Sequence, residues 1–263
     1  MPESDVMAAG QPGSGALAGK VALITGAAGF IGRATAAVLA SRGARIVAVD
    51  RPGADLGPLR AAIVGDAPVT VEADVTDEGG VARYVETALT ISGRIDIFFN
   101  NAGIEGPQAA IPDYPAAEFR RILDVNVTGV FLGLQAVMPV MIAQQEGSII
   151  NTSSIAGLVG SATMAGYVAS KHAVLGLTRV AALEGAPHGV RVNSIHPGFI
   201  ESRMLSDIIG RMGGQDTEFA AMVPAKRLGT ADEIARAVAF LAGDDSRYMN
   251  GSAMVIDGGL TVA

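Results

Sequence analysis

A tyrosine and a lysine four residues apart form the clearest chemical pair in the sequence. Tyr167 and Lys171 fall within a stretch of helical spacing, and side chains at positions i and i+4 of a helix lie on one face. A free tyrosine has a pKa of about 10, too high for ready proton exchange at neutral pH. Because a nearby ammonium favours the phenolate, we expect it to lower the pKa of Tyr167. The pair predicts a tyrosine that acts as a general acid and base.

A serine hydroxyl precedes this pair at the end of an apolar run. Ser154 follows the stretch Ser148–Asn151, which is typical of a strand, and Ser153 stands beside it. A hydroxyl at that point can donate a hydrogen bond to a substrate oxygen as negative charge develops there. The sequence therefore offers a second polar group for the same reaction centre.

Alternating β and α patterns predict the scaffold that positions these groups. Continuous apolar runs are typical of parallel strands covered on both faces, and parallel strands need helical crossovers. We expect a single doubly wound α/β domain with a parallel, Rossmann-type sheet. The predicted strands are Val21–Ile24, Arg45–Val49, Val69–Val71, Ile95–Phe99, Ser148–Asn151, Arg191–Ile195 and Ala253–Ile256. The predicted helices are Ile31–Arg42, Asp77–Ser92, Pro115–Gln144, Gly166–Ala186 and Ala231–Ala242.

A glycine-rich turn joins the first predicted strand to the first predicted helix. Backbone N–H groups in such a turn, together with a helix N-terminus, bind a pyrophosphate. This context favours a dinucleotide site over a tight turn without a ligand. The residues assigned to it are Gly26, Gly29, Phe30, Ile31 and Gly32.

A carboxylate at the end of the second predicted strand indicates which dinucleotide binds. Asp50 is placed to accept hydrogen bonds from the adenosine ribose hydroxyls. It would repel a 2′-phosphate, which carries roughly −1.5 to −2 charges at neutral pH. The adjacent Arg51 partly offsets that repulsion. We expect NAD as the cofactor in preference to NADP.

Composition excludes several other classes of protein. The 263 residues carry a net charge of −7 without a basic run, which argues against nucleic-acid binding. Cysteine is absent, which excludes disulfides and thiolate sites, and His172, His188 and His196 lack metal-ligand spacing. No metal, signal peptide or membrane span is expected. We interpret residues 1–16 as a flexible tail, 17–263 as the catalytic domain, and the protein as cytoplasmic.

Six further segments in a fixed order resemble the short-chain dehydrogenase/reductase family, in its short single-domain branch. The resemblance covers the chain from Leu17 to its end and implies a seven-stranded sheet of order 3-2-1-4-5-6-7. It also implies hydride transfer between NAD(H) and a secondary alcohol or ketone. The segments are Asn100-Asn101-Ala102-Gly103, Asp124-Val125-Asn126-Val127-Thr128-Gly129, Ser153-Ser154, Tyr167-Val168-Ala169-Ser170-Lys171, Pro197-Gly198 and Asp257-Gly258-Gly259.

The resemblance also assigns roles to individual residues. It selects Ser154 over Ser153, and it gives Asn126 a water on the path from Lys171 to solvent. The implied catalytic set is Asn126, Ser154, Tyr167 and Lys171. The implied further cofactor contacts are Asp74, Val75, Asn100, Ala102, Gly103, Tyr167, Lys171, Pro197, Gly198, Ile200 and Ser202.

The substrate is expected to be a small molecule, cyclic or otherwise bulky, in a largely apolar pocket. An apolar helical stripe lies where the family places its substrate lid, and glycines beside it could make that lid mobile. The pocket residues are Ile104, Glu105, Met164, Met204 and Leu205. The family commonly forms tetramers through its long helices, so we expect a homotetramer, with a dimer as the alternative.

Two histidines lie beside the catalytic motifs. His172 follows Lys171 directly, and adjacent helix positions point about 100° apart, so we expect it to face away from Tyr167. His196 precedes Pro197, which favours an extended loop start. For His196 we expect a role in positioning the backbone rather than in chemistry.

Two alternative functions remain open. Phe30 occupies the usual second glycine position, and the pattern T-G-x-x-G-x-x-G is typical of the longer branch that includes sugar-nucleotide epimerases and dehydratases. That reading would need an added substrate domain. A non-catalytic NAD(H) sensor could keep the glycine turn and Asp50 but would not need Tyr167 and Lys171.

Overall fold

One parallel sheet of seven strands organises the molecule. The computed structural model describes residues 15–201 and 216–263, so residues 1–14 of the predicted tail lie outside it. The strand order is β3-β2-β1-β4-β5-β6-β7, and every neighbouring pair is parallel. This confirms the predicted fold class and strand order. The strands are β1 (Val21–Thr25), β2 (Arg45–Asp50), β3 (Val69–Glu72), β4 (Ile97–Asn100), β5 (Gly147–Thr152), β6 (Val190–Pro197) and β7 (Ala253–Ile256).

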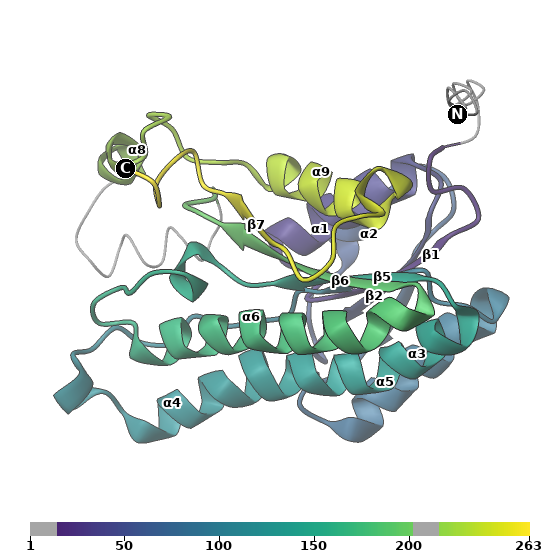
Figure 1. Cartoon of the computed structure of the whole chain (residues 1–263), viewed down its shortest axis with the longest axis horizontal. Helices are drawn as coiled ribbons and strands as arrows, with labels where there is room; N and C mark the ends of the chain where they lie inside the picture. The colour runs from purple at the N-terminus through teal and green to yellow at the C-terminus, as the bar shows by residue number, and fades with distance from the viewer. Residues whose placement is uncertain (1–14, 202–215) are drawn as a thin grey trace, which may run out of the picture.

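Helices cover both faces of this sheet (Figure 1). One face carries α1 (Phe30–Ser41), α2 (Gly57–Ala62) and α9 (Ala231–Ala242). The other carries α3 (Glu78–Ser92), α5 (Gly129–Gln144) and α6 (Ala165–Gly185). Two further helices are α4 (Ala116–Leu123), which leads into α5, and α8 (Asp216–Met222).

The two helical layers explain why the central strands read as unbroken apolar runs. Leu23 of β1 belongs to the core under α3, α5 and α6, whereas its neighbour Ile24 belongs to the core under α1 and α9. Successive strand residues point to opposite faces, so both faces of β1 are buried. The same holds for Phe98 and Phe99 of β4.

The predicted helix Pro115–Gln144 is not one regular α-helix. Asp124–Thr128 form a π-helical turn between α4 and α5, where backbone bonds span five residues rather than four. Apolar spacing does not reveal such a local change of winding. The stretch 116–144 is long and apolar enough to cross a membrane by length and composition, with half of its most apolar window buried. Its α5 part contributes Val137 and Met141 to the core.

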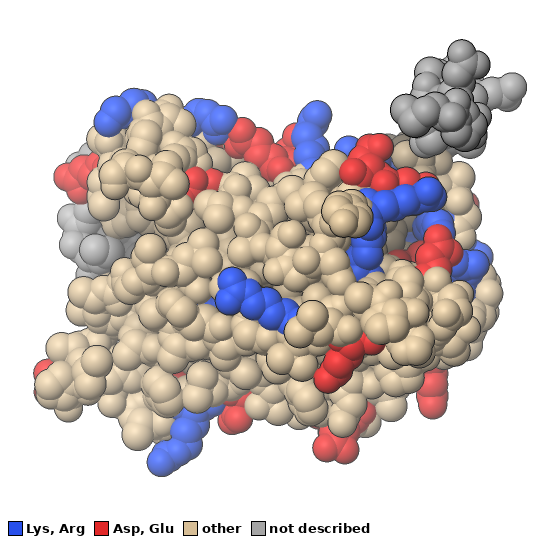
Figure 2. Space-filling view, in the orientation of Figure 1, with Lys and Arg blue, Asp and Glu red and all other residues tan. Residues whose placement is uncertain are grey.

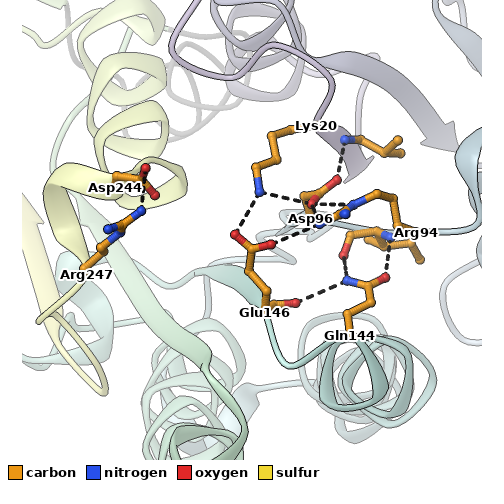
Figure 3. Close-up of polar contacts among 9 residues, drawn as sticks. Lys20, Arg94, Asp96, Gln144, Glu146, Asp244 and Arg247 are labelled. Atoms are coloured by element: carbon orange, nitrogen blue, oxygen red, sulfur yellow. Dashed lines mark hydrogen bonds and ion pairs between the residues drawn. The ribbon is translucent and has the colours of Figure 1, made fainter. Parts of the chain in front are cut away.

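A cluster of charges joins the amino ends of three strands, at the edge of the sheet opposite the strand ends that carry the predicted site (Figure 3). Asp96 is 3% exposed and pairs with Lys20 and Arg94. Its Oδ2 atom accepts a hydrogen bond of 2.8 Å from the backbone N–H of Val21. Glu146 pairs with both cations from the start of β5. The cluster fixes where β1, β4 and β5 begin.

Candidate functional site

The glycine turn lies between β1 and α1, as predicted. Gly26 has φ +66°, a left-handed conformation that favours glycine. A Cβ atom on Gly32 would lie 2.2 Å from the Gly26 carbonyl oxygen, so the helix can start this close to the turn only with glycine there. Gly29 precedes α1 without a side-chain cap, and the first turn of α1 holds no acidic residue. The uncapped N–H groups suit an anion such as pyrophosphate.

Phe30 starts the helix and does not fill the turn. Its side chain is 46% exposed, and the guanidinium carbon of Arg33 lies 5.2 Å from its ring centroid. Ile31 follows as the second helical residue. The replacement of the usual glycine by Phe30 therefore leaves the strand–turn–helix geometry intact.

Asp50 at the end of β2 is hydrogen-bonded to the glycine turn. Its Oδ2 atom accepts a hydrogen bond of 2.8 Å from the Ala28 N–H, and its Oδ1 atom accepts one from Arg51. The carboxylate is half-buried, whereas Arg51 is exposed. Both donors are backbone N–H groups, which carry no net charge and do not neutralise the carboxylate. The arrangement keeps a negative charge beside the turn.

The segment after β4 forms a second wall of the same site. Asn101 donates from its backbone N–H to Thr25 Oγ1 and from its side chain to the Thr25 carbonyl, at 2.9 and 3.1 Å. Ala102 donates to the same Thr25 hydroxyl. Asn100, a predicted cofactor contact, instead donates to the Val130 carbonyl and is 2% exposed. Thr25 and Asn101 belong to segments that sequence analysis singled out, but their role in joining the two segments was not predicted, because it depends on a contact between residues 76 positions apart.

Asp74 and Val75 follow β3 at the predicted place. The exposed carboxylate of Asp74 accepts two hydrogen bonds from Thr76, through its N–H and its hydroxyl. Val75 is buried, and a Cβ atom on Gly129 would lie 2.8 Å from its side chain. Val75 thus packs the start of α5 against the end of β3.

Asn126 is fully buried in the π-helical turn and binds the segment after β4. Its Oδ1 atom accepts from the Ile104 N–H and its Nδ2 atom donates to the Ile104 carbonyl, each at 2.8 Å. Nδ2 also donates to the Ser170 hydroxyl. A Cβ atom on Gly103 would lie 3.2 Å from Asn126 Oδ1 and 3.4 Å from Lys171 Nζ. The structure therefore brings Asn126 Oδ1 and Lys171 Nζ to the same side of Gly103, where both border the space that a Cβ atom would take.

Ser154 and Tyr167 face each other from different elements. Ser154 follows β5 and caps the short 3₁₀ helix Ile155–Gly157, where its Oγ atom accepts from the Ala156 N–H. Tyr167 lies in the first turn of α6. Burial raises the pKa of Tyr167, the hydrogen bond with Ser154 lowers it, and the charge of Glu105 raises it. Without a cofactor the protein groups together thus raise the pKa of Tyr167. The expected lowering, to which the positive charge of an oxidised nicotinamide would contribute, stays a prediction.

Lys171 lies one helical turn beyond Tyr167, on the same face of α6. Its Nζ atom donates a hydrogen bond of 2.9 Å to the Thr152 carbonyl and lies 5.5 Å from the centroid of the Tyr167 ring. The side chain is buried, and burial lowers the pKa of Lys171 to about 8. The ammonium is thus held beside the tyrosine at a cost in solvation.

The end of β6 closes the site next to the last strand. Pro197 and Ile200 are buried, and a Cβ atom on Gly198 would lie 2.8 Å from Asp257 Cα. The Asp257 carboxylate accepts from the N–H groups of Gly259 and Thr261, which folds the chain after β7 into a turn. Of the predicted contacts here, Ser202 lies outside the described residues.

The predicted substrate residues are described in part. Ile104, Glu105 and Met164 are half-buried. Ala109 pairs with Met164 in an isolated bridge, so the segment after β4 runs beside the start of α6. Met204, Leu205 and the rest of the predicted lid lie outside the described residues.

His172 and His196 differ in burial and in their hydrogen-bond partners. His172 is exposed and its Nδ1 atom lies 2.9 Å from the Val168 carbonyl oxygen, one turn back on α6. His196 is fully buried between Ser154 and Ser194. In the part of the chain that the structure describes, no group of three or more His, Cys, Asp or Glu side chains could hold a metal.

Comparison with known proteins places residues 26–261 in a family model described as enoyl-(acyl carrier protein) reductase. Levodione reductase from Leifsonia aquatica is 42% identical over 253 residues, which cover 93% of this chain and 95% of that protein. Cyclohexanol dehydrogenase from Acinetobacter sp. (strain SE19) is 38% identical over 92% of this chain and 95% of its own length.

Solved structures agree with these relatives. The crystal structure of levodione reductase superposes with a TM-score of 0.91 over 94% of this chain and 99% of its own. The crystal structure of an NAD⁺-bound xylitol dehydrogenase, 40% identical, has a TM-score of 0.88 over 92% of this chain and 99% of its own. The chain therefore matches these proteins along nearly its full length.

Proposed function

This chain belongs to the short-chain dehydrogenase/reductase family, and from that premise we propose that it transfers hydride between NAD(H) and a cyclic or bulky secondary alcohol. It is an oxidoreductase that oxidises alcohols and reduces ketones with a nicotinamide cofactor. We also propose that residues 17–263 form one catalytic domain.

The observation that carries the proposal is the meeting of Ser154, Tyr167 and Lys171 at one edge of the sheet. The serine follows β5, and the other two lie on one face of α6. The same edge carries the glycine turn and Asp50, which follow β1 and β2. A proton-transfer set beside a pyrophosphate cradle is the arrangement that alcohol oxidation by a dinucleotide requires.

Tyr167 is the proposed acid and base. In alcohol oxidation its phenolate oxygen takes the hydroxyl proton, and in ketone reduction the same oxygen returns it. The Ser154 hydroxyl, already bonded to Tyr167, donates to the substrate oxygen as charge develops there. A nicotinamide bound beside these residues would supply the hydride acceptor, and the positive charge of its oxidised form would favour the Tyr167 phenolate.

Lys171 supplies the cation that the chain itself places near the tyrosine. Burial raises the pKa of Tyr167. An ammonium 5.5 Å from the ring centroid acts against this effect, because a positive charge favours the phenolate. Asn126 Oδ1 and Lys171 Nζ border the same space beside Gly103, 3.2 and 3.4 Å from where a Cβ atom on that glycine would lie. One bridging water between them would connect the ammonium to solvent, and this is the proposed role of Asn126.

Asp50 supports NAD rather than NADP as the cofactor. Its half-buried carboxylate is held beside the glycine turn by hydrogen bonds from the Ala28 and Arg51 N–H groups, and a negative charge there would repel a 2′-phosphate. The neighbouring Arg51 is exposed and makes no ion pair with Asp50 among the interactions of the described residues. The NAD⁺-bound xylitol dehydrogenase is one relative with this cofactor in its structure.

The substrate proposal rests on two relatives and on the pocket residues. Levodione reductase and cyclohexanol dehydrogenase are named for cyclic substrates. The described part of the pocket, Ile104, Glu105 and Met164, combines apolar surface with one carboxylate beside Tyr167. We propose a cyclic or bulky secondary alcohol, with Met204 and Leu205 completing the pocket.

Exposed apolar side chains support self-association, as a homotetramer or alternatively a dimer. Phe131 on α5 and Val180 and Leu183 on α6 are 46%, 54% and 78% exposed. Figure 2 shows few charged side chains over these two helices. A largely uncharged face of this kind is typical of a contact between subunits. A solution mass equal to one chain at micromolar concentration would refute both assemblies.

We propose a cytoplasmic location.

The experiment that tests the proposal measures formation of reduced nicotinamide by absorbance. The purified protein receives NAD⁺ or NADP⁺ and a panel of cyclic, aromatic, sugar and steroid alcohols, with Tyr167→Phe as the matched variant. Turnover with NAD⁺ that is lost in the variant is the expected result. Tight NAD⁺ binding with no turnover on any alcohol would favour the sensor function, and no binding of either nucleotide would refute the proposal.

A further inference from the structure

His196 at the end of β6 contacts the loop that carries Ser154. The imidazole is fully buried. Its Nδ1 atom lies 2.8 Å from the Ser154 carbonyl oxygen, and its Nε2 atom lies 2.9 Å from Ser194 Oγ. A carbonyl oxygen carries no hydrogen, so Nδ1 must be the donor. The ring therefore links the end of β6 to the end of β5.

Its surroundings keep this ring in one neutral tautomer. With the hydrogen on Nδ1, Nε2 is an acceptor, and the Ser194 hydroxyl donates to it. Burial lowers the pKa of His196, the bond with Ser154 raises it, and the charges of Lys171, Arg179 and His172 lower it further. A neutral ring at physiological pH is the result. A second serine contact, 3.3 Å from Ser194 Oγ to the Ser252 carbonyl, is longer than the one to the ring.

Ser154 is fixed through its carbonyl from two sides. Its backbone is extended, with φ −167° and ψ 165°, immediately before a 3₁₀ turn. The carbonyl oxygen accepts from the Gly157 N–H at 2.9 Å and from His196 Nδ1. Two hydrogen bonds to one carbonyl restrain the peptide plane after Ser154, and this restrains the backbone from which the Ser154 side chain projects. That side chain bonds to Tyr167.

We propose that His196 is a positioning residue for Ser154, whose Nδ1–H holds the Ser154 peptide so that the hydroxyl faces Tyr167 and the reacting oxygen. The proposal rests on the proposed function, since it assigns a role within that reaction. His196 also directly precedes Pro197, the last residue of β6. The same side chain therefore links the serine to the β6 end of the site. A shift of about 1 Å at a catalytic group reduces rates by as much as about 100-fold.

Three variants test the role in catalysis. His196→Leu fills a similar volume without a donor, and His196→Asn replaces Nδ1–H by an amide N–H. His172→Leu is the matched control, because its Nδ1 atom also lies 2.9 Å from a backbone carbonyl but on the exposed side of α6. We expect His196→Leu to lower kcat by about 10- to 100-fold with the KM for alcohol and the Kd for NAD⁺ unchanged. His196→Asn should recover most of kcat, and His172→Leu should match the wild type.

Two outcomes would overturn the proposal. One is an unchanged kcat in His196→Leu, and the other is an equal loss of kcat in the Asn and Leu variants, which would indicate packing alone. If the Leu variant does not fold, the Asn variant and the next measurement still decide.

Nitrogen-15 NMR of histidine-labelled wild-type protein tests the hydrogen bond without any need for activity. We expect one ring, assigned to His196 by its loss in His196→Asn, as a neutral Nδ1–H tautomer with slow solvent exchange at pH 7. An Nε2–H tautomer or an imidazolium there would contradict the proposal. A wild-type protein that binds NAD⁺ but turns over no alcohol would refute the proposed function, while this spectrum would still decide the bond to Ser154.

Discussion

The buried ammonium of Lys171 lies 5.5 Å from the centroid of the Tyr167 ring and is neutralised by no carboxylate in the part of the chain that the structure describes. Its resolved partner is the Thr152 carbonyl, 2.9 Å away. A cation in such a place favours the tyrosinate, and the same burial penalises the cation itself. Function and stability should therefore respond in opposite directions when Lys171 is changed.

Lys171→Met should abolish alcohol oxidation and stabilise the free protein at neutral pH. The fall of the pKa of Lys171 from 10.5 to about 8 corresponds to about 3 kcal/mol against folding with the charge buried. The variant loses a hydrogen bond to Thr152 worth about 1.5–3 kcal/mol, so the net gain at pH 7 should be about 1 kcal/mol. Denaturant unfolding measures it. Lys226→Met, at an exposed lysine that donates to the Ala221 carbonyl, is the control and should show no gain.

The stability of the same variant should approach that of the wild type as the pH rises. A group whose pKa is lowered on folding contributes stability above its unfolded pKa and loses it as the pH falls through its folded pKa. Wild-type stability should thus rise with pH between about 8 and 10.5, relative to Lys171→Met. A difference between the two proteins that stays constant from pH 7 to pH 10 would show that Lys171 is not a desolvated cation.

Asp50→Asn should weaken the preference for NAD. The amide keeps an acceptor for the Ala28 N–H but removes the charge that repels a 2′-phosphate. The ratio of kcat/KM with NAD⁺ to that with NADP⁺ should fall by about tenfold or more, which is about 1.4 kcal/mol. Glu72→Gln is the matched control, because Glu72 pairs with Asp50 in the sheet register and its carboxylate is exposed. A ratio that falls equally in both variants would assign the preference to overall charge.

Patterns of spacing predicted the sheet well, because its strands are buried on both faces. Leu23 and Ile24 reach different cores, so no polar residue interrupts their run. Tyr167 and Lys171 were predicted to share a face because helical geometry fixes i and i+4 positions. These features depend on local sequence alone.

The remaining features depend on what packs nearby, and the sequence does not contain that directly. The helix α2 (Gly57–Ala62) has only Leu59 buried, too little apolar spacing to predict it. Burial raises the pKa of Tyr167, and spacing does not reveal this effect because desolvation depends on neighbours from several elements. The link between His196 and Ser154 joins residues 42 positions apart, and no spacing rule connects them.

Gly32→Ala should disrupt the turn where the pyrophosphate is proposed to bind. The added Cβ atom would meet the Gly26 carbonyl oxygen at 2.2 Å and Ala27 Cα at 2.9 Å, both of them backbone. Since no side chain can move aside, we expect a loss of about 1–3 kcal/mol in stability and weaker NAD⁺ binding. Gly29→Ala, whose Cβ atom would lie 3.3 Å from its nearest neighbour, should lose no more than about 1 kcal/mol. Equal stability of the two variants would contradict the close approach.

Asp96→Asn should destabilise the fold without changing the site at the other edge of the sheet. Asp96 is nearly buried and joins Lys20, Arg94 and the Val21 N–H (Figure 3). The asparagine side chain has the size of the aspartate and keeps one acceptor oxygen, but it carries no charge. Lys20 and Arg94 then have Glu146 as their one remaining carboxylate in this cluster. Fully buried pairs lose about 3–5 kcal/mol when one partner is removed. Because both cations here are partly exposed, we expect about 2 kcal/mol, with kcat retained.

Glu146→Gln is the matched variant of the same cluster, and its effect should depend on pH. Glu146 is 54% exposed, so its loss should change stability by less than about 1 kcal/mol. The hydrogen bond from Lys20 lowers the pKa of Glu146 most, burial raises it, and the charge of Lys20 and contacts with Arg94 lower it further. The contribution of Glu146 is therefore present above its unfolded pKa, about 4.3, and is lost as the pH falls through the lower folded value. Urea unfolding at pH 7 and below pH 4 measures both variants. A larger loss for Glu146→Gln than for Asp96→Asn at pH 7 would mean that the exposed carboxylate, and not the buried one, holds the starts of β1, β4 and β5 together.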